Sequence, residues 1–155
     1  MAKKDRLKAE LEAAEQELFR VIGSVSMEQW ERETQNVGWT VKDTLAHLLS
    51  GETGNLLVAK RVLGGESAPV KDFDLHRYNQ RQVEKLRDRG VEQLREDLKS
   101  ARRETLTMLE GLTDEQLATR GRRTTGEETT LEAVFRQIAR HMQTHADDIR
   151  IAIES

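Results

Sequence analysis

The sequence has 155 residues, 36% of them hydrophobic and 34% charged, with a net charge of −3 from 28 acidic and 25 basic side chains. This length suits one domain with a real core, which we place over residues 1–155, and the mixed charge argues against a nucleic-acid-binding surface. Because there is no cysteine, disulfides, thiolate metal ligands and a cysteine nucleophile are excluded.

The composition is typical of an all-α protein, since proline occurs once and β-branched runs are few. The N-terminus carries no apolar signal region, and no apolar run is long enough to span a membrane. We therefore expect a cytoplasmic protein without a membrane partner.

The first part of the chain predicts one long helix and one short turn. Apolar residues at helical spacing indicate a helix over Lys3–Ile22, which Gly23 is expected to end. Ser26–Gln29 has the spacing of a capping box and predicts a short helical turn that carries Trp30. A loop over Asn36–Trp39 follows.

A second helix is expected over Thr40–Leu63, with its threonine as N-cap and Asp43 in the first turn. Glu52 falls on the apolar stripe of this helix, which is unfavourable unless the carboxylate is paired. Gly51 and Gly54 lie inside the helix and cost about 1 kcal/mol each relative to alanine. Close helix packing explains them, and so does room for a ligand beside the helix.

The segment Gly64–Pro69 is the clearest loop in the chain. A third long segment, Asp72–Leu109, is predicted to be helical with a break near Arg89–Gly90, and Gly111 is expected to stop it. Thr113–Gln116 is a second capping box.

A polar loop over Thr119–Glu128 is expected before the last helix, which Thr129 is predicted to cap with Glu132 in its first turn. The apolar stripe of this helix extends to Ile153. Three arginines give the loop a short basic patch, which we interpret as a solvated surface: Arg120, Arg122 and Arg123.

The two halves of the chain match one another. A set of positions aligns without gaps, namely Leu7, Leu11, Phe19, Ile22, Ser26, Gln29 and Trp30 with Leu94, Leu98, Leu106, Leu109, Thr113, Gln116 and Leu117. After a small insertion, Thr40 and Asp43 align with Thr129 and Glu132. Each half therefore has a helix, a short capped turn, a loop and a capped helix. Two such units predict a four-helix bundle with an internal pseudo-twofold repeat.

Three of the four histidines form a candidate metal site. His141 and His145 are spaced i, i+4 on the last helix, which puts their Cβ atoms about 6 Å apart on one face. His47 lies on the second helix, the symmetry mate of the last, and supplies a third ligand. Three imidazoles suit Zn, Ni, Fe or Cu and leave coordination positions open. The alternative is that these histidines are hydrogen-bonded core residues. The fourth, His76, is interpreted as exposed to solvent.

A histidine that binds a metal usually donates its other ring N–H to a nearby acceptor. Glu52, Asp147 and Asp148 are candidates for this role, and helix geometry does not choose among them. Asn79 and Tyr78 are candidates for a pocket wall, with capping, packing or solvent exposure as the alternative, which we favour for Tyr78.

These residues carry a family resemblance. Gly38–Glu52 resembles the second-helix motif of the DinB/YfiT-like superfamily, which includes the N-terminal domain of mycothiol-dependent maleylpyruvate isomerases. His141 and His145 resemble the two other metal ligands of that superfamily, and Phe73–Asn79 is similar to the third helix of its ClbS/DfsB-like branch. The resemblance spans nearly the whole chain.

The resemblance implies a four-helix bundle with a three-histidine divalent metal site, commonly nickel or zinc, at one end of a cavity. It also implies a homodimer, and activities that include thiol-dependent transferases, isomerases and hydrolases. The chain ends at Ser155, so the second domain of the mycothiol-dependent isomerases is not expected.

The leading hypothesis is a metal-dependent enzyme that acts on a small molecule, with water or a low-molecular-weight thiol as nucleophile. Any thiol must come from a cosubstrate, because the chain has no cysteine. The alternatives are a binding or sequestration protein whose metal anchors a small molecule or stabilises the bundle, and a structural helical module whose histidines are core residues.

Overall fold

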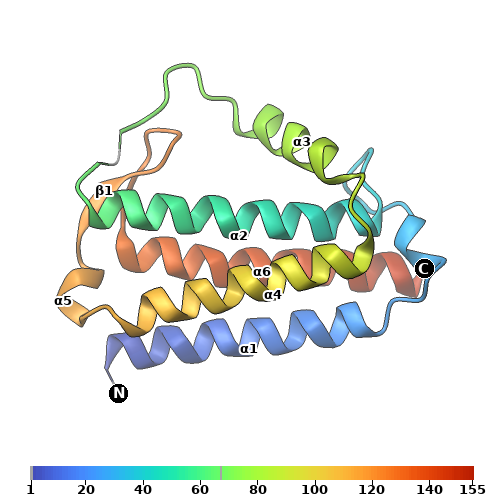
Figure 1. Ribbon diagram of the computed structural model, residues 1–155, viewed down its shortest axis with the longest axis horizontal. Coiled ribbons are helices and arrows are strands. Elements are labelled where there is room, and N and C mark those ends of the chain that lie inside the picture. Colours follow the sequence, from blue (N-terminus) through green and yellow to red (C-terminus); the bar gives the residue numbers. More distant parts are fainter. Residues whose placement is uncertain (1, 67) are drawn as a thin grey trace.

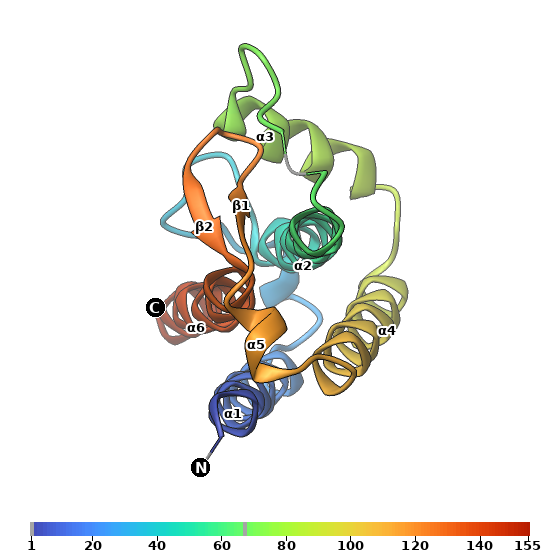
Figure 2. The same ribbon diagram turned by 90° about the vertical axis from the view of Figure 1, so that its left-hand side faces the viewer.

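Four long helices dominate the computed structural model, which describes residues 2–66 and 68–155 (Figure 1). They are α1 Lys3–Gly23, α2 Val41–Leu63, α4 Val91–Glu110 and α6 Leu131–Glu154. Helices α1 and α6 run in one direction, and α2 and α4 run in the opposite one (Figure 1). Viewed end-on, the four helices surround one core in the order α1, α6, α2, α4 (Figure 2). The predicted four-helix bundle is confirmed.

The core is built from apolar side chains at helical spacing. On α1, Leu7, Leu11 and Leu18 have no exposed surface, and the other three long helices contribute similar stripes. Burying such a side chain stabilises the fold by about 1.5–3 kcal/mol relative to leaving it exposed. None of the described helices has the length and apolar content needed to cross a bilayer.

Both predicted capping boxes are present and mark the repeat. In the first unit, the backbone N–H of Ser26 donates to Oε1 of Gln29 at 2.8 Å and the reverse bond is 3.3 Å, ahead of the short 3₁₀ helix η1, Gln29–Glu31. In the second, Thr113 and Gln116 exchange the same bonds at 2.9 and 3.1 Å around α5, Asp114–Leu117. Each unit therefore turns into its second long helix in the same way.

The third predicted segment is broken where expected. Helix α3, Leu75–Leu86, ends before Gly90, which is the N-cap of α4. Helix α3 lies outside the bundle against α2 (Figure 2). It therefore covers the face of α2 that the core leaves free. Ser67, in the predicted loop before this helix, lies outside the described residues, as does Met1.

The prediction of a polar loop over Thr119–Glu128, before the last helix, was wrong in part. It contains an antiparallel hairpin of β1, Arg120–Arg122, and β2, Glu128–Thr130. Strands this short carry no alternating apolar pattern, so the sequence gives no periodic signal for them. The hairpin moves the helix start by one residue: the side chain of Thr130, rather than Thr129, accepts the N–H of Ala133 and caps α6.

Glu52 is paired, as its place on an apolar stripe requires. Its carboxylate is buried and accepts from Nη1 of Arg102 at 2.9 Å and from the hydroxyl of Thr105 at 2.5 Å. Arg102 is also fully buried, and donates to the carbonyl of Leu11 at 3.3 Å. This network joins α2 to α4 and α1 on the side of α2 that faces the core.

Candidate metal centre

The structure brings His47 of α2 together with His141 and His145 of α6. One ring nitrogen of each lies within 4.8 Å of the others. The Nε2 atoms of His47 and His141 are 2.9 Å apart, and the ring centroids are 4.5–4.6 Å apart throughout the cluster. Three imidazoles thus converge on one point between two helices.

A glycine makes this convergence fit. The ring of His141 lies over Gly51 of α2, where a Cβ atom would be 2.8 Å from Nδ1 and closer still to Cε1. Any larger residue would push the ring away from its partners. Gly54 has no atom within 4 Å of its virtual Cβ and borders a cavity instead. Of the two explanations for the glycines, close packing applies to Gly51 and space applies to Gly54.

The outer side of the cluster is held by Asp148 of α6 and by two residues of the loop before α2, Asn36 and Trp39. Nδ1 of His145 bonds Oδ2 of Asp148 at 2.9 Å, and Asn36 donates to the same carboxylate oxygen at 3.3 Å. The ring of Trp39 lies 4.8 Å from that of His47, and its Nε1 donates to Gln80 of α3 at 2.8 Å. Asp148 therefore leaves Nε2 of His145 free to face the cluster, while Trp39 shields His47 from solvent.

Burial keeps the three imidazoles neutral. Desolvation, followed by repulsion from His145, lowers the pKa of His47 from 6.5 to about 4. Burial also lowers the pKa of His141 well below its ordinary value, and both neighbouring histidines act in the same direction. The pKa of His145 is lowered by burial too, although the hydrogen bond and charge of Asp148 oppose this. Neutral imidazole is the form that binds a metal ion.

The donor set fits a divalent transition metal. Two imidazole nitrogens that share one ion at about 2.0–2.1 Å lie about 3 Å apart when their bonds meet near a right angle, close to the distance between the Nε2 atoms of His47 and His141. Without an ion, the same two atoms are at the distance of an N–H···N hydrogen bond, in which one ring donates and the other accepts. The buried Nδ1 of His47 has no hydrogen-bond partner among the described residues, so His47 lacks the acceptor that Asp148 gives to His145.

A cavity of about 470 Å³ opens beside the cluster, and both His47 and His141 line it. Its wall also contains Asn79 and the half-exposed Tyr78, whose ring packs 5.5 Å from that of Phe73. Asn79 and Tyr78 therefore both border the cavity, and Tyr78 is also exposed and packed on Phe73, the interpretation favoured for it from the sequence. His76 is exposed and lies elsewhere, as interpreted from the sequence.

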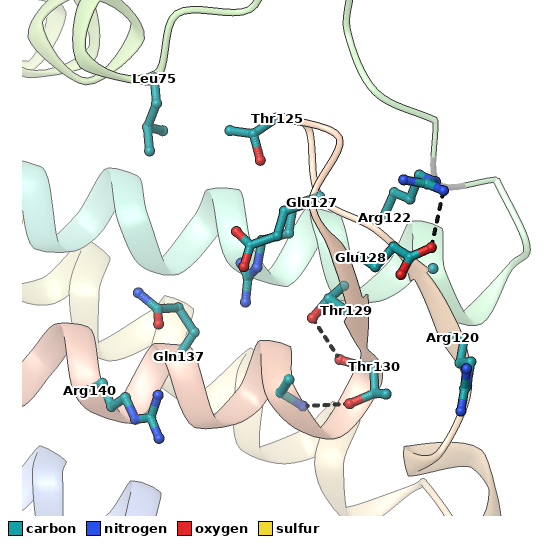
Figure 3. Close-up of a pocket in the computed structure, with 13 residues that line it drawn as sticks. Leu75, Arg120, Arg122, Thr125, Glu127, Glu128, Thr129, Thr130, Gln137 and Arg140 are labelled. Atoms are coloured by element: carbon teal, nitrogen blue, oxygen red, sulfur yellow. Dashed lines mark hydrogen bonds and ion pairs between the residues drawn. The ribbon is translucent and has the colours of Figure 1, made fainter.

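A larger groove of about 850 Å³ is lined mainly by the hairpin and the start of α6 (Figure 3). It is lined by residues of both charges, and Arg122 pairs with its strand neighbour Glu128 at 3.2 Å (Figure 3). None of the three histidines lines it. Size alone therefore does not mark the site, and the smaller cavity is the one that meets the imidazoles.

Only one of the three predicted acceptors serves a histidine. Asp148 bonds His145, whereas Asp147 pairs with Arg150 at 2.7 Å and Glu52 faces Arg102 on the opposite side of α2. The sequence interpretation missed Trp39, whose motif neighbours were noted but whose ring position depends on the loop. The interpretation of the three hairpin arginines as a solvated surface was wrong for Arg123, which is partly buried and lines the cavity.

The family model described as the DinB superfamily matches residues 10–149. The chain belongs to the DinB superfamily. The resemblance inferred from the histidine motifs is confirmed. No curated protein matches the chain.

Several solved structures share the DinB fold. YfiT from Bacillus subtilis, described as a probable metal-dependent hydrolase with an unusual four-helix bundle topology, has a TM-score of 0.80 and 20% identity over 96% of this chain and 85% of that one. ClbS, a colibactin self-resistance protein solved with double-stranded DNA, has a TM-score of 0.77 and 15% identity over 96% and 94%. Mycothiol-dependent maleylpyruvate isomerase has a TM-score of 0.81 and 11% identity over 96% of this chain and 63% of that one. At sequence identities this low, the similarity to these structures shows that the fold is shared.

Proposed function

We propose that this DinB-superfamily protein binds a divalent metal, nickel or zinc, through His47, His141 and His145, and is an enzyme acting on a small molecule. The observation that carries the proposal is the meeting of three imidazoles, one buried and two partly buried, two of which line a cavity of about 470 Å³. A metal bound there would act as a Lewis acid or lower the pKa of water or a thiol.

The residues of the chain would prepare the site for such chemistry. The three imidazoles supply uncharged donors, Asp148 orients one of them, and the ring of Trp39 limits access of water to His47. Because the chain has no cysteine, the nucleophile would be water or a low-molecular-weight thiol that enters the cavity. The reaction is then a hydrolysis or a transfer to that thiol.

The number of ligands favours an enzyme over a structural metal. Among the described residues, the cluster has three members and no fourth histidine or carboxylate joins it. Structural zinc sites usually have four protein ligands, whereas catalytic ones keep a position open. A sequestration protein is the second candidate, since an open position can also anchor a ligand that is never converted.

Metal analysis of the purified protein tests the proposal. The wild type should carry about one equivalent of metal, His141→Ala should carry almost none, and His76→Ala should match the wild type because His76 is exposed and outside the cluster. Equal metal in wild type and His141→Ala would refute the site. Turnover of activated esters or thiol acceptors then separates enzyme from sequestration protein.

We also propose that the partner is a small molecule and not nucleic acid. The net charge is −3, and the arginines of the hairpin groove are interspersed with Glu127 and Glu128. Because ClbS was solved with DNA, a gel-shift titration with duplex DNA at low and moderate salt is the direct check. Tight binding that weakens steeply with salt would contradict the proposal.

A further inference from the structure

The charged side chains that line the cavity beside the histidines are all positive. Its wall contains Arg61 and Arg123, and no aspartate or glutamate among the described residues, although the chain as a whole is acidic. Much of the rest of the wall is apolar, from Leu57, Val58, Val70, Phe73, Leu75 and Tyr78. A wall of this composition favours a ligand with an apolar body and a negative charge, and disfavours a cation.

Arg123 is held in place by hydrogen bonds that start on α2. The side-chain amide of Asn55 donates to the carbonyl of Gly51 at 2.9 Å, and its Oδ1 accepts from Nη1 of Arg123 at 3.2 Å. The backbone of Arg123 is fixed as well, since its N–H donates to Glu127 and its carbonyl accepts from Gly126, both at 2.8 Å. The guanidinium is therefore positioned before a ligand arrives, which lowers the entropy cost of binding.

The charge of Arg123 is not neutralised by a contacting carboxylate of the described residues. Its side-chain bond goes to the uncharged Asn55, and Glu127 attracts it only from beyond ion-pair distance. Burial lowers the pKa of Arg123, which shows that its charge is partly desolvated. Arg122, the preceding residue and the last of β1, contrasts with it because it bonds Glu128 (Figure 3). A desolvated guanidinium with unused N–H donors is suited to a planar anion.

The distance to the histidines sets the size of the ligand. Asn55, which holds Arg123, lies one helical turn after Gly51, whose surface the His141 ring covers. Positions one turn apart on a helix are separated by about 6 Å. One small molecule could therefore contact the guanidinium and reach the imidazoles.

We propose that the cavity binds a small organic carboxylate with an apolar body, with the carboxylate on Arg123 and the other end toward His47 and His141. The carboxylate site stands on the contacts of Arg123. That the far end reacts at the histidines rests on the proposed metal-dependent function.

Three probes of similar shape test the charge preference: 3-phenylpropionate, 3-phenylpropionamide and 3-phenylpropylamine. Each is titrated by calorimetry into metal-loaded and metal-stripped protein. The carboxylate should bind at least tenfold more tightly than the amide or the amine in both forms. Arg123→Met should remove this preference, while Arg120→Met, which changes an exposed arginine of the same hairpin, should keep it. Arg123→Lys, which retains the charge without the planar fork, should keep part of it.

Several results would overturn the carboxylate site. Equal binding of the carboxylate to wild type and to a folded Arg123→Met would do so, and so would an amine that binds as well as the acid. A preference that survives Arg123→Met but disappears in His141→Ala would show that the anion binds the metal instead. If the wild type holds no metal yet prefers the carboxylate through Arg123, the proposed enzymatic function fails and the carboxylate site stands. Circular dichroism and thermal unfolding of each variant establish that it is folded.

Discussion

A methyl group added at Gly51 should disable the metal centre. The Cβ of an alanine would lie 2.8 Å from Nδ1 and 3.0 Å from Nε2 of His141, so the ring must leave its position opposite His47. Gly54→Ala is a matched control, because it makes the same substitution one turn along α2 with nothing within 4 Å. Any difference between the two variants therefore reports the contact with His141.

The expected magnitudes differ for stability and for metal binding. Replacing a glycine inside a helix by alanine stabilises it by about 1 kcal/mol, so Gly54→Ala should raise the melting temperature by about 2–4 °C. For Gly51→Ala the same gain is offset by about 1–3 kcal/mol of overpacking. Displacing a ligand should weaken metal binding by at least about 100-fold, which corresponds to about 2.7 kcal/mol, whereas Gly54→Ala should bind within about threefold of wild type.

Calorimetric titration of Ni²⁺ and Zn²⁺ into metal-stripped protein measures the affinities, and thermal unfolding measures the stabilities. If Gly51→Ala binds both metals as tightly as the wild type and is stabilised as much as Gly54→Ala, then His141 does not lie over Gly51 in the working protein. The account of the site given above would then be wrong.

Three further predictions follow from contacts of the cluster and of the core. Asp148→Asn should weaken metal binding about 10–100-fold by removing the charged acceptor that orients its histidine, as calorimetry can show, and an unchanged affinity would contradict that role. Metal-stripped protein should lose stability as the pH falls from 6.5 toward 4, because His47 takes up a proton in this range only in the unfolded chain; in the folded protein its pKa is about 4. The melting temperature of His47→Asn should therefore fall less than that of the wild type over the same pH range. Arg102→Met leaves the carboxylate of Glu52 buried and unpaired, which should cost about 3–5 kcal/mol in denaturant unfolding, and adding Glu52→Leu should restore most of the loss.

The long helices and the ligands were predictable because their signals are periodic. Helix α2 begins after Thr40, as predicted, since a threonine cap with Asp43 in the first turn is a local hydrogen-bond pattern. The proximity of His141 and His145 follows from the pitch of one helix. His47 was placed near them by the internal repeat, which made its helix the mate of theirs. Each of these inferences needs only spacing along the chain.

The walls of the site were not predictable because they depend on how separate elements meet. Asp147 and Asp148 are neighbours in sequence but differ by about 100° around the helix, so which of them faces His145 depends on the rotation of α6. The ring of Trp39 reaches His47 from a loop, and Arg123 reaches the cavity from a hairpin whose strands have three residues each. Such placements carry no periodic signal in the sequence.

The one-residue correction to the N-cap of α6 explains why the metal ligands are divided unequally between the two halves of the chain, with one on α2 and two on α6. Aligning the observed caps Thr40 and Thr130 puts three pairs of positions in register: His47 with Gln137, Gly51 with His141, and Asn55 with His145. All but His145 line the same cavity. The repeat therefore places both the metal ligands and their mates at one crossing of α2 and α6.

At that crossing the equivalent positions face each other, because α2 and α6 run in opposite directions (Figure 1). Gly51 and His141 are in contact, so they lie where the pseudo-twofold axis passes between the helices. Two large side chains cannot occupy this point together, and one imidazole requires a glycine opposite. The symmetry of the fold thus forces an asymmetric site: one side of the crossing holds the ligands, and Asn55, the mate of His145, instead positions Arg123.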